Sequence, residues 1–375
     1  MVEIREALTK REQKEFLEFP NRLYRDCPYY VAPLYMDEKK IFRKDYVYYD
    51  TCEAVYYNAY RDGRMVGRIN GILQRSSNEK WGQKRVRFSR FDCIDDPEVA
   101  KALFDALEAW ARSKGMEEIV GPLGFSDLER EGLLIEGFDQ MSTFEEAYNY
   151  DYYQPLIEAQ GFAKEVDWLE SQIRFPKDPE SFEEMKKMAE FVMKRYHLRI
   201  GPAKNTADFL RRYADQFFEL LDRSYDKIYG TVPFSDGMKR MLMDNFKLII
   251  DLNYVAVVLD ENDRPVCIGI CFPCIAKPMQ ASGGHLTPKA LLRFLKARYR
   301  PDVVDLGLIG VEPEYLNRGV SVIFAYELAK MLRKPGIKYA DTNLNLEDNA
   351  AINNLWKRFD QFQNKRRRSF VKKIV

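Results

Sequence analysis

The same order of predicted elements occurs twice along the chain, and this internal repeat limits the fold more than any other feature. In each half a polar turn joins two β-prone runs, which read AVYYNAYRDGRMVGRINGI (54–72) and YVAVVLDENDRPVCIGICF (254–272). Such pairs of runs predict β-hairpins. Gly67 and Gly269 take equivalent positions in the returning strands. A repeat of this period predicts two domains built on one plan, which suits a chain of 375 residues.

Each hairpin is followed by a helical pattern that ends near a glycine and leads into a further strand. The two helical segments are EVAKALFDALEAWARSKG (98–115) and SVIFAYELAKMLRKPG (321–336), with apolar residues at helical spacing. A short helix and a strand then close each half. Strand, helix and strand in this order predict a right-handed parallel crossover. The expected fold class is therefore α/β, or α+β with a mixed sheet, in two tandem domains whose sheets are flanked by helices.

A break at Pro176–Pro179 separates the two halves, and the residues after it read as a connecting helix. The predicted organisation is a first domain over 1–176, a connecting helix over 177–197 and a second domain over 198–375. The first domain carries an additional loop, roughly Gly121–Asn149, that is rich in glycine and acidic residues.

Charge and hydropathy set the expected location and exclude some partners. Lys and Arg number 59 against 58 Asp and Glu, so the balanced charge predicts no nucleic acid or membrane partner. The first residues are charged where a signal peptide needs an apolar run, and no apolar stretch approaches the ~20 residues that cross a bilayer. These features predict a cytoplasmic protein.

A zinc site is one interpretation of Cys267, Cys271 and Cys274, with His285 downstream. The alternative is a buried strand, because VCIGICFPC is apolar and small thiols are common in cores. Cys267 and Cys271 would then share one face of the strand. The second interpretation is preferred, so we expect no metal.

The segment from Val303 to Ser321 predicts a strand that enters a helix through a tight turn. Val303–Val311 is apolar and β-prone, Glu312 and Pro313 begin the turn, and Leu316–Ser321 opens the helix. A helix N-terminus offers unpaired backbone N–H groups and the positive end of a dipole. A glycine allows close approach of a ligand, and Gly319 supplies one. This arrangement suits a pyrophosphate.

Here the chain resembles the GNAT acetyltransferases, in which a strand ending in Val-x-Pro-Glu-Tyr precedes a Gln/Arg-x-x-Gly-x-Gly/Ala turn. The matching residues are Val311, Pro313, Glu314 and Tyr315, followed by LNRGVS at 316–321. Leu316 departs from Gln/Arg, and Ser321 is still small. The resemblance implies acetyl-CoA or another acyl-CoA as co-substrate, held by Ile309, Gly310, Val311, Leu316, Asn317, Arg318, Gly319, Val320 and Ser321.

Further positions carry the same resemblance. Asn349 matches an asparagine that lies near the pantetheine arm in the family, and Trp356 stands where many members have a tyrosine acid, so the resemblance implies that both contact the coenzyme. An indole N–H donates a hydrogen bond but is no acid near neutral pH. Glu347 and Asp348 are alternatives for the acid, or else they cap the following helix. Asp305 matches a general base found in some members, the alternative being a solvent-facing carboxylate at the start of the strand.

The first half lacks this turn, because Asp95, Asp96 and Pro97 stand in its place and carboxylates repel a pyrophosphate. Its acidic loop, FSDLEREGLLIEGFD (125–139), is open to two interpretations: attraction of a cationic amine, or a solvated surface loop.

The resemblance implies transfer of an acyl group from acyl-CoA to an amine, an acceptor expected to be a small molecule. The alternative is a non-catalytic ligand-binding or interaction protein of the same fold, favoured by Leu316 and Trp356. A weaker alternative is an aminoacyl- or peptidyl-transferase.

Overall fold

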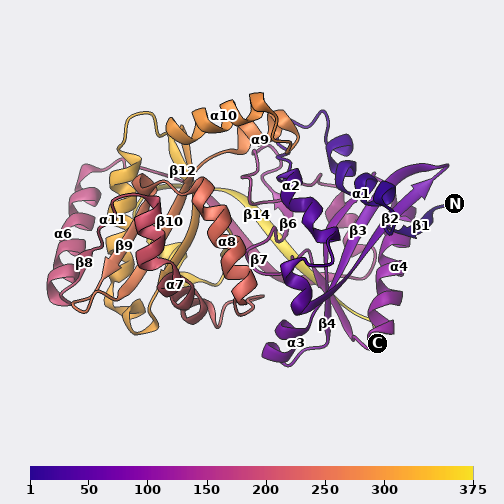
Figure 1. The fold of residues 1–375 in the computed structure, drawn as a ribbon, viewed down its shortest axis with the longest axis horizontal. Coiled ribbons are helices and arrows are strands. Elements are labelled where there is room, and N and C mark those ends of the chain that lie inside the picture. The colour runs from indigo at the N-terminus through magenta and orange to yellow at the C-terminus, as the bar shows by residue number, and fades with distance from the viewer. Residues whose placement is uncertain (375) are drawn as a thin grey trace. The chain divides into compact units, whose positions relative to one another are not determined.

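The computed structural model describes residues 1–374, apart from the side chains of Phe246 and Leu248, and the chain forms two compact units (Figure 1). Unit 1 consists of Met1–Trp168, Ala276–Arg293 and the residues from Lys365 onward, and unit 2 of Leu169–Ile275 and Phe294–Asn364. The units are thus discontinuous, whereas the sequence predicted continuous domains at 1–176 and 198–375. Packing decides which residues form a compact unit, and a strand packs with its pairing partners whatever their distance in sequence.

Unit 1 contains a sheet of order β1-β2-β3-β4-β5-β14, with β6 beside β14. Its elements are β1 (Glu3–Glu6), α1 (Lys10–Leu23), α2 (Tyr35–Glu38), η1 (Lys39–Phe42), η2 (Val47–Asp50), β2 (Cys52–Arg61), β3 (Arg64–Gln74), α3 (Arg75–Trp81), β4 (Arg85–Cys93), α4 (Pro97–Ser113), β5 (Glu118–Gly121), β6 (Leu133–Glu136), α5 (Tyr153–Glu158) and α9 (Ala276–Ser282).

Unit 2 contains a sheet of order β7-β12-β11-β10-β9-β8, with β13 beside β7. Its elements are α6 (Pro179–Arg195), β8 (Arg199–Ile200), α7 (Thr206–Tyr225), α8 (Asp236–Ile249), η3 (Leu252–Tyr254), β9 (Val255–Leu259), β10 (Pro265–Pro273), β11 (Val303–Val311), η4 (Pro313–Arg318), α11 (Val320–Leu332), β12 (Tyr339–Asp341), β13 (Asn345–Leu346) and α12 (Ala350–Trp356). Three elements contain residues of both units: β7 (Ala163–Arg174), α10 (Pro288–Tyr299) and β14 (Asp360–Lys373).

The predicted repeat is confirmed in both units. β2 pairs with β3 and β9 with β10 as antiparallel hairpins, and the first turn places Asp62 and Gly63 at positive φ. β4 and β5, joined through α4, pair in parallel, as do β11 and β12, joined through α11. α6 confirms the helix predicted between the halves, and it packs within unit 2.

The equivalent glycines Gly67 and Gly269 let the crossover helix lie close to the sheet in each unit. A Cβ on Gly269 would stand 2.0 Å from the ring of Phe324 in α11, and one on Gly67 3.0 Å from Leu103 in α4. α11 and α6 cover the same face of the unit 2 sheet, and α7 packs its apolar residues on the other face. Among the described residues no helix has both the length and the hydrophobicity needed to cross a bilayer.

We expect Gly269→Ala to destabilise unit 2 by about 2 kcal/mol, because overpacking forces the Phe324 ring and α11 outward. The midpoint of urea unfolding measures the effect. Gly67→Ala is the matched control, since its contacts of 3.0 Å need a smaller adjustment. Equal losses in the two variants would contradict this explanation of the glycines.

Candidate functional site

Strand β11 leaves its partner β12 after a short pairing, and this opens one edge of the strand. The parallel register ends at Asp305 opposite Asp341, where β12 also ends, while β11 continues to Val311. The register with β10 shifts by one residue at Gly307, which is a β-bulge. Bulges re-aim side chains and end pairing, and they are frequent beside active sites. Ile309, Gly310 and Val311 therefore lie on a stretch of β11 beyond its pairing with β12.

Helix α7 braces this open stretch from one face of the sheet. The Tyr225 hydroxyl donates to the Ile309 carbonyl at 3.1 Å, and Arg223 forms an ion pair with the buried Glu312 at 2.6 Å. A Cβ on Gly310 would contact Leu220 at 3.2 Å. The strand end is thus held by side chains that the sequence did not single out, because they come from a helix some 85 residues earlier.

The turn after β11 leads into a helix, as the sequence predicted. Pro313–Arg318 form a 3₁₀ helix, Gly319 follows at φ +75°, and α11 begins at Val320. No described side chain caps this helix, and Val322 N–H bonds back to the Gly319 carbonyl. The first N–H groups of α11, those of Val320 and Ser321, therefore lie at an uncapped positive helix end.

Positive charge stands beside this helix end. The Arg318 guanidinium lies 5.0 Å from the ring centre of Tyr315 and 5.5 Å from that of Tyr196, and Arg195 lies 5.6 Å from Tyr196. Stacking on aromatic rings restricts where the two guanidinium groups point. The sequence identified Arg318 but missed Arg195, which α6 brings from more than a hundred residues away.

The remaining turn residues face solvent. Leu316 is 52% exposed, and Asn317 is also exposed. The departure from Gln/Arg at Leu316 thus leaves a surface side chain and does not alter the backbone of the turn, which Gly319 and Pro313 shape.

Asp305 is buried, so the alternative of a solvent-facing carboxylate is wrong. It lies in register with the buried Asp341, and neighbouring strands run about 4.8 Å apart. Burial, with a smaller effect from the Asp305 charge, raises the pKa of the Cys271 thiol to about 12. Burial and the charges of Asp341 and Asp305 raise the pKa of Tyr339 to about 12. The sequence missed Asp341 because parallel pairing alone brings it beside Asp305.

Two residues of the predicted site have structural contacts of their own. The Asn349 side chain caps α12 by accepting from the Ile352 N–H at 3.3 Å. Trp356 is 4% exposed, and its indole N–H lies 3.5 Å from the Asn345 side-chain oxygen. The ring of Trp356 thus belongs to the core of unit 2. Glu347 and Asp348 are exposed and do not provide the cap.

In unit 1, side chains bond to the backbone at the two positions that are uncovered in unit 2, the end of the strand and the N-terminus of the crossover helix. The Tyr152 hydroxyl donates to the Cys93 carbonyl at 2.9 Å, and the Cys93 N–H donates to the Tyr153 hydroxyl at 3.2 Å, both at the end of β4. Asp96 caps α4 by accepting from the N–H groups of Glu98 and Val99. Side chains of unit 1 thus occupy both the strand end and the helix end.

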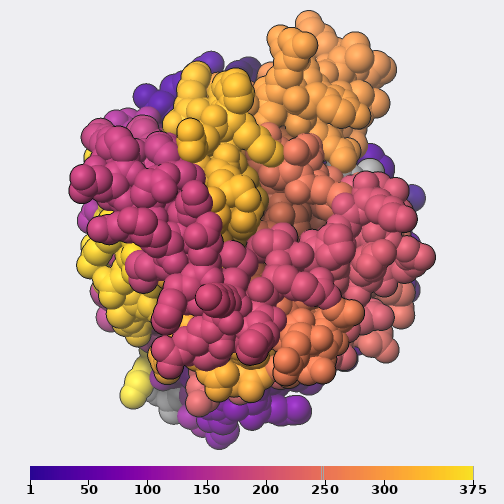
Figure 2. Space-filling view, turned by 90° about the vertical axis from the view of Figure 1, so that its left-hand side faces the viewer, coloured from indigo at the N-terminus to yellow at the C-terminus, as the bar shows by residue number. Residues whose placement is uncertain are grey.

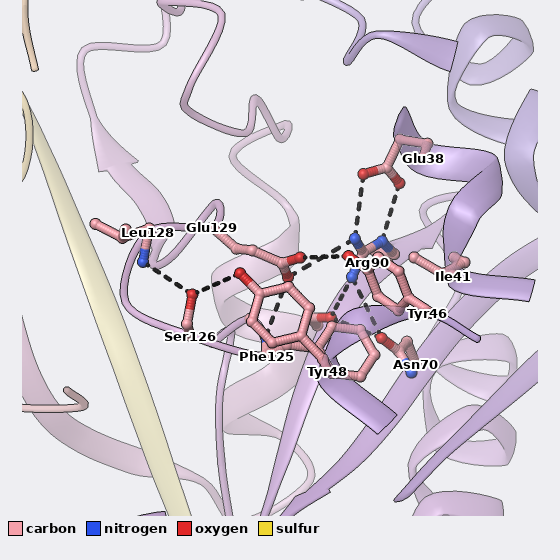
Figure 3. A network of polar contacts seen from close by, with 12 residues as sticks. Glu38, Ile41, Tyr46, Tyr48, Asn70, Arg90, Phe125, Ser126, Leu128 and Glu129 are labelled. Atoms are coloured by element: carbon pink, nitrogen blue, oxygen red, sulfur yellow. Dashed lines mark hydrogen bonds and ion pairs between the residues drawn. The ribbon is translucent and has the colours of Figure 1, made fainter. Parts of the chain in front are cut away.

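A network of charged and aromatic side chains occupies the bulge of β4 in unit 1 (Figure 3). Arg90, at φ +48°, donates two hydrogen bonds to Glu38 at 2.9 and 3.1 Å and lies 3.8 Å from Glu129. The Tyr46 hydroxyl donates to Glu129 at 3.1 Å. Glu129 belongs to the acidic loop, so this carboxylate serves an internal ion pair, and the loop is neither a fully solvated segment nor a row of free charges.

We expect Arg90→Gln to destabilise unit 1 by about 3–5 kcal/mol, because Glu38 and Glu129 would remain enclosed without their cation. Burial opposes ionisation of Glu38, but the charge and hydrogen bonds of Arg90 lower its pKa to about 2. A pKa below the ordinary glutamate value of 4.5 means that this stability is present above pH 4.5 and is lost as the pH falls toward 2. Urea unfolding of the protein and of Glu38→Gln at several acidic pH values measures the effect. Glu38→Gln should lose less stability on acidification than the unmodified chain. Equal losses would contradict the assignment of this pH dependence to Glu38.

The cysteine cluster has the buried arrangement that the sequence favoured. Cys267 and Cys271 are buried and pack into the same core, so they share one face of β10 as predicted. Burial raises the pKa of each thiol to about 12, and metal binding needs thiolates. Among residues 1–374, no group of three or more His, Cys, Asp and Glu side chains is placed to hold a metal ion.

Comparison with solved structures identifies the architecture. A tandem GNAT protein from the clavulanic acid biosynthesis pathway matches 100% of this chain with 99% of its own, at a TM-score of 0.57 and 12% identity. A GCN5-related N-acetyltransferase from Sphaerobacter thermophilus matches 100% of this chain with 96% of its own, at a TM-score of 0.51 and 11% identity. At these identities the likeness concerns the fold.

Two relatives are similar in sequence. Protein YghO from Escherichia coli K12 is 28% identical over 384 residues, which cover 99% of this chain and 95% of YghO. A protein named bacterial ceramide synthase, from Caulobacter vibrioides, is 30% identical over 251 residues, which cover 66% of this chain and 64% of that protein. No protein-family model matches the chain.

Proposed function

Because the chain has the tandem GNAT fold, we propose that it is an N-acyltransferase in which unit 2 binds an acyl-CoA and transfers its acyl group to an amine. The observation that carries the proposal is the difference between the units. In unit 2 the α11 N-terminus is uncapped behind Gly319, whereas Asp96 caps the equivalent helix of unit 1. The predicted coenzyme residues, Trp356 among them, remain part of the proposal.

The proposed roles follow from the chemistry of the groups. The N–H groups of Val320 and Ser321, with Arg318 beside them, would bind the pyrophosphate. Backbone groups of Ile309, Gly310 and Val311 would hold the substrate along the open edge of β11 and polarise its carbonyl.

Asp305 would accept the proton of the amine as it attacks, giving the amide by way of a tetrahedral intermediate. Because the indole of Trp356 is no acid near neutral pH, solvent or another residue would protonate the departing thiolate. Direct attack needs no covalent acyl-enzyme, so one bound complex of both substrates suffices for the reaction.

The acceptor class has a second candidate besides a small soluble amine. One relative is named a bacterial ceramide synthase, and ceramide is the amide of a fatty acid with a long-chain amino alcohol. That name supports a lipid amine as acceptor for this chain. The two candidates differ in the acyl-CoA they would use, because a ceramide carries a long acyl chain.

Titration calorimetry and thermal unfolding with acetyl-CoA and octanoyl-CoA test the proposal. Ligand at 100 times its Kd should stabilise the folded chain by about 2.7 kcal/mol, which raises the unfolding temperature by a few degrees. Absence of both heat and thermal shift at millimolar ligand would exclude the transferase and favour a non-catalytic role. Tighter binding of octanoyl-CoA than of acetyl-CoA would favour the lipid acceptor.

A further inference from the structure

Helix α10, Pro288–Tyr299, exposes large apolar side chains that no described part of the chain covers. Leu291 is 49% exposed, Leu292 69% and Tyr299 74%. Ala290 is the one residue of α10 in the buried core. The light-orange segment around these residues lies at the molecular surface (Figure 2). Exposed apolar side chains that gather on one helix mark an interaction site more often than scattered ones do.

The apolar side chains of α10 lie together on one face. Leu291, Leu295 and Tyr299 are four residues apart, and Leu292 lies seven before Tyr299, which places all four on one stripe of the helix. Ala290, Phe294 and Ala297 lie at the opposite side. Arg298 lies between the two sides, and its guanidinium donates to the Ile250 carbonyl at 3.1 Å.

A basic stripe runs beside the apolar one. Lys289, Arg293, Lys296 and Arg300 follow one another three or four residues apart, and all four are exposed. The segment from 275 to 301 contains no Asp or Glu. The formal net charge of +1 conceals this patch, because acidic residues elsewhere balance it.

An apolar stripe flanked by Lys and Arg is the pattern of a helix that lies in the interface of a membrane. Leucine and tyrosine side chains enter the boundary between headgroups and acyl chains, and the basic stripe contacts anionic headgroups. We propose that α10 docks this protein peripherally on a bilayer that contains anionic phospholipid. The occupant follows from charge complementarity together with the apolar stripe, since a nucleic acid would match the charge but not the leucines.

Co-sedimentation of the full chain with phospholipid vesicles tests the proposal. Vesicles of phosphatidylcholine with about 30% phosphatidylglycerol should bind the protein, and vesicles of phosphatidylcholine alone should bind it at least about tenfold more weakly. Lys289→Gln/Arg293→Gln/Lys296→Gln should weaken binding to the anionic vesicles by about tenfold or more. Leu291→Gln/Leu292→Gln should do the same, because it removes the side chains that insert.

Matched controls separate α10 from general effects of charge and hydrophobicity. Lys10→Gln/Arg11→Gln/Lys14→Gln removes three exposed charges from α1, and Leu8→Gln/Met36→Gln removes two exposed apolar side chains. Both controls should bind vesicles like the unmodified chain. Calorimetry with acetyl-CoA on the α10 variants should match the unmodified chain, so a failure of membrane docking is distinguishable from a failure of coenzyme binding.

Three results would overturn the proposal. The first is absence of binding to anionic vesicles at moderate salt. The second is equal binding by the α10 variants and their controls. The third is binding of the full chain through α10 to a single-stranded oligonucleotide, measured by fluorescence anisotropy, in the absence of vesicle binding.

Discussion

Gly319→Trp is expected to weaken acyl-CoA binding by about 100-fold or more, since two hydrogen bonds to a charged group are worth at least about 1.5 kcal/mol each. Gly319 has a φ of +75°, a conformation that costs an L-residue about 1–2 kcal/mol. A Cβ there would be in van der Waals contact with Val192 of α6 at 3.4 Å, so the larger indole would be directed away from α6. The ring would therefore cover the N–H groups of Val320 and Ser321 at the N-terminus of α11 and block the pyrophosphate from them. Titration calorimetry measures the change in Kd.

Gly115→Trp is the matched control for backbone strain. Gly115 has a φ of +71° and open space around it, and it follows α4 in unit 1, whereas the proposed coenzyme site belongs to unit 2. Both variants should lose a similar amount of stability, while Gly115→Trp should keep its affinity for acyl-CoA. Unchanged affinity in Gly319→Trp would show that the coenzyme binds elsewhere.

Asp305→Asn is expected to lower turnover by about 10²–10⁴-fold while leaving the Kd for acyl-CoA unchanged, because an amide accepts no proton from the attacking amine. The side chain is nearly isosteric, so the buried site keeps its shape. Asp305 is 2% exposed, in register with Asp341 on the neighbouring strand. Steady-state assays with an amine acceptor over a range of pH measure the effect.

Asp341→Asn serves as the comparison for Asp305→Asn. It alters the same pair of carboxylates but keeps the proposed base, so it should shift the pH profile with a smaller loss of turnover. A purely structural role for Asp305 would instead lower stability and leave the shape of the pH profile intact. Full activity of Asp305→Asn would remove this residue from the mechanism.

Local signals in the sequence predicted much of the fold. The two hairpins, the crossover helices and the helix between the halves all follow from periodicity, turn residues and glycine positions, and all are present. Gly319 was recognisable because a strand, a turn and a helix follow one another without interruption. Such short-range features depend little on the rest of the chain.

The features that the sequence did not reveal depend on contacts between distant residues. Arg195 and Asp341 join the site through a packed helix and a parallel strand, which no local pattern announces. Trp356 matched a family position by spacing, but the core of unit 2 encloses its ring. The half-buried ion pair of Arg90 with Glu129 likewise required the loop to fold back onto β4.

Strand β14 has a consequence for the order in which the chain can fold. Phe370–Lys373 pair with Gly121–Glu118 of β5, so an edge of the first sheet stays open until the ribosome has released residues some 250 positions later. Domains usually fold in turn as they emerge, N-terminal domain first. Here the sheet of the first half cannot be completed before β14 is synthesised. Until then its exposed edge can pair with other nascent chains. A fragment cut after residue 176 would carry the same open edge permanently, so we expect dissection of this protein into its halves to yield aggregates.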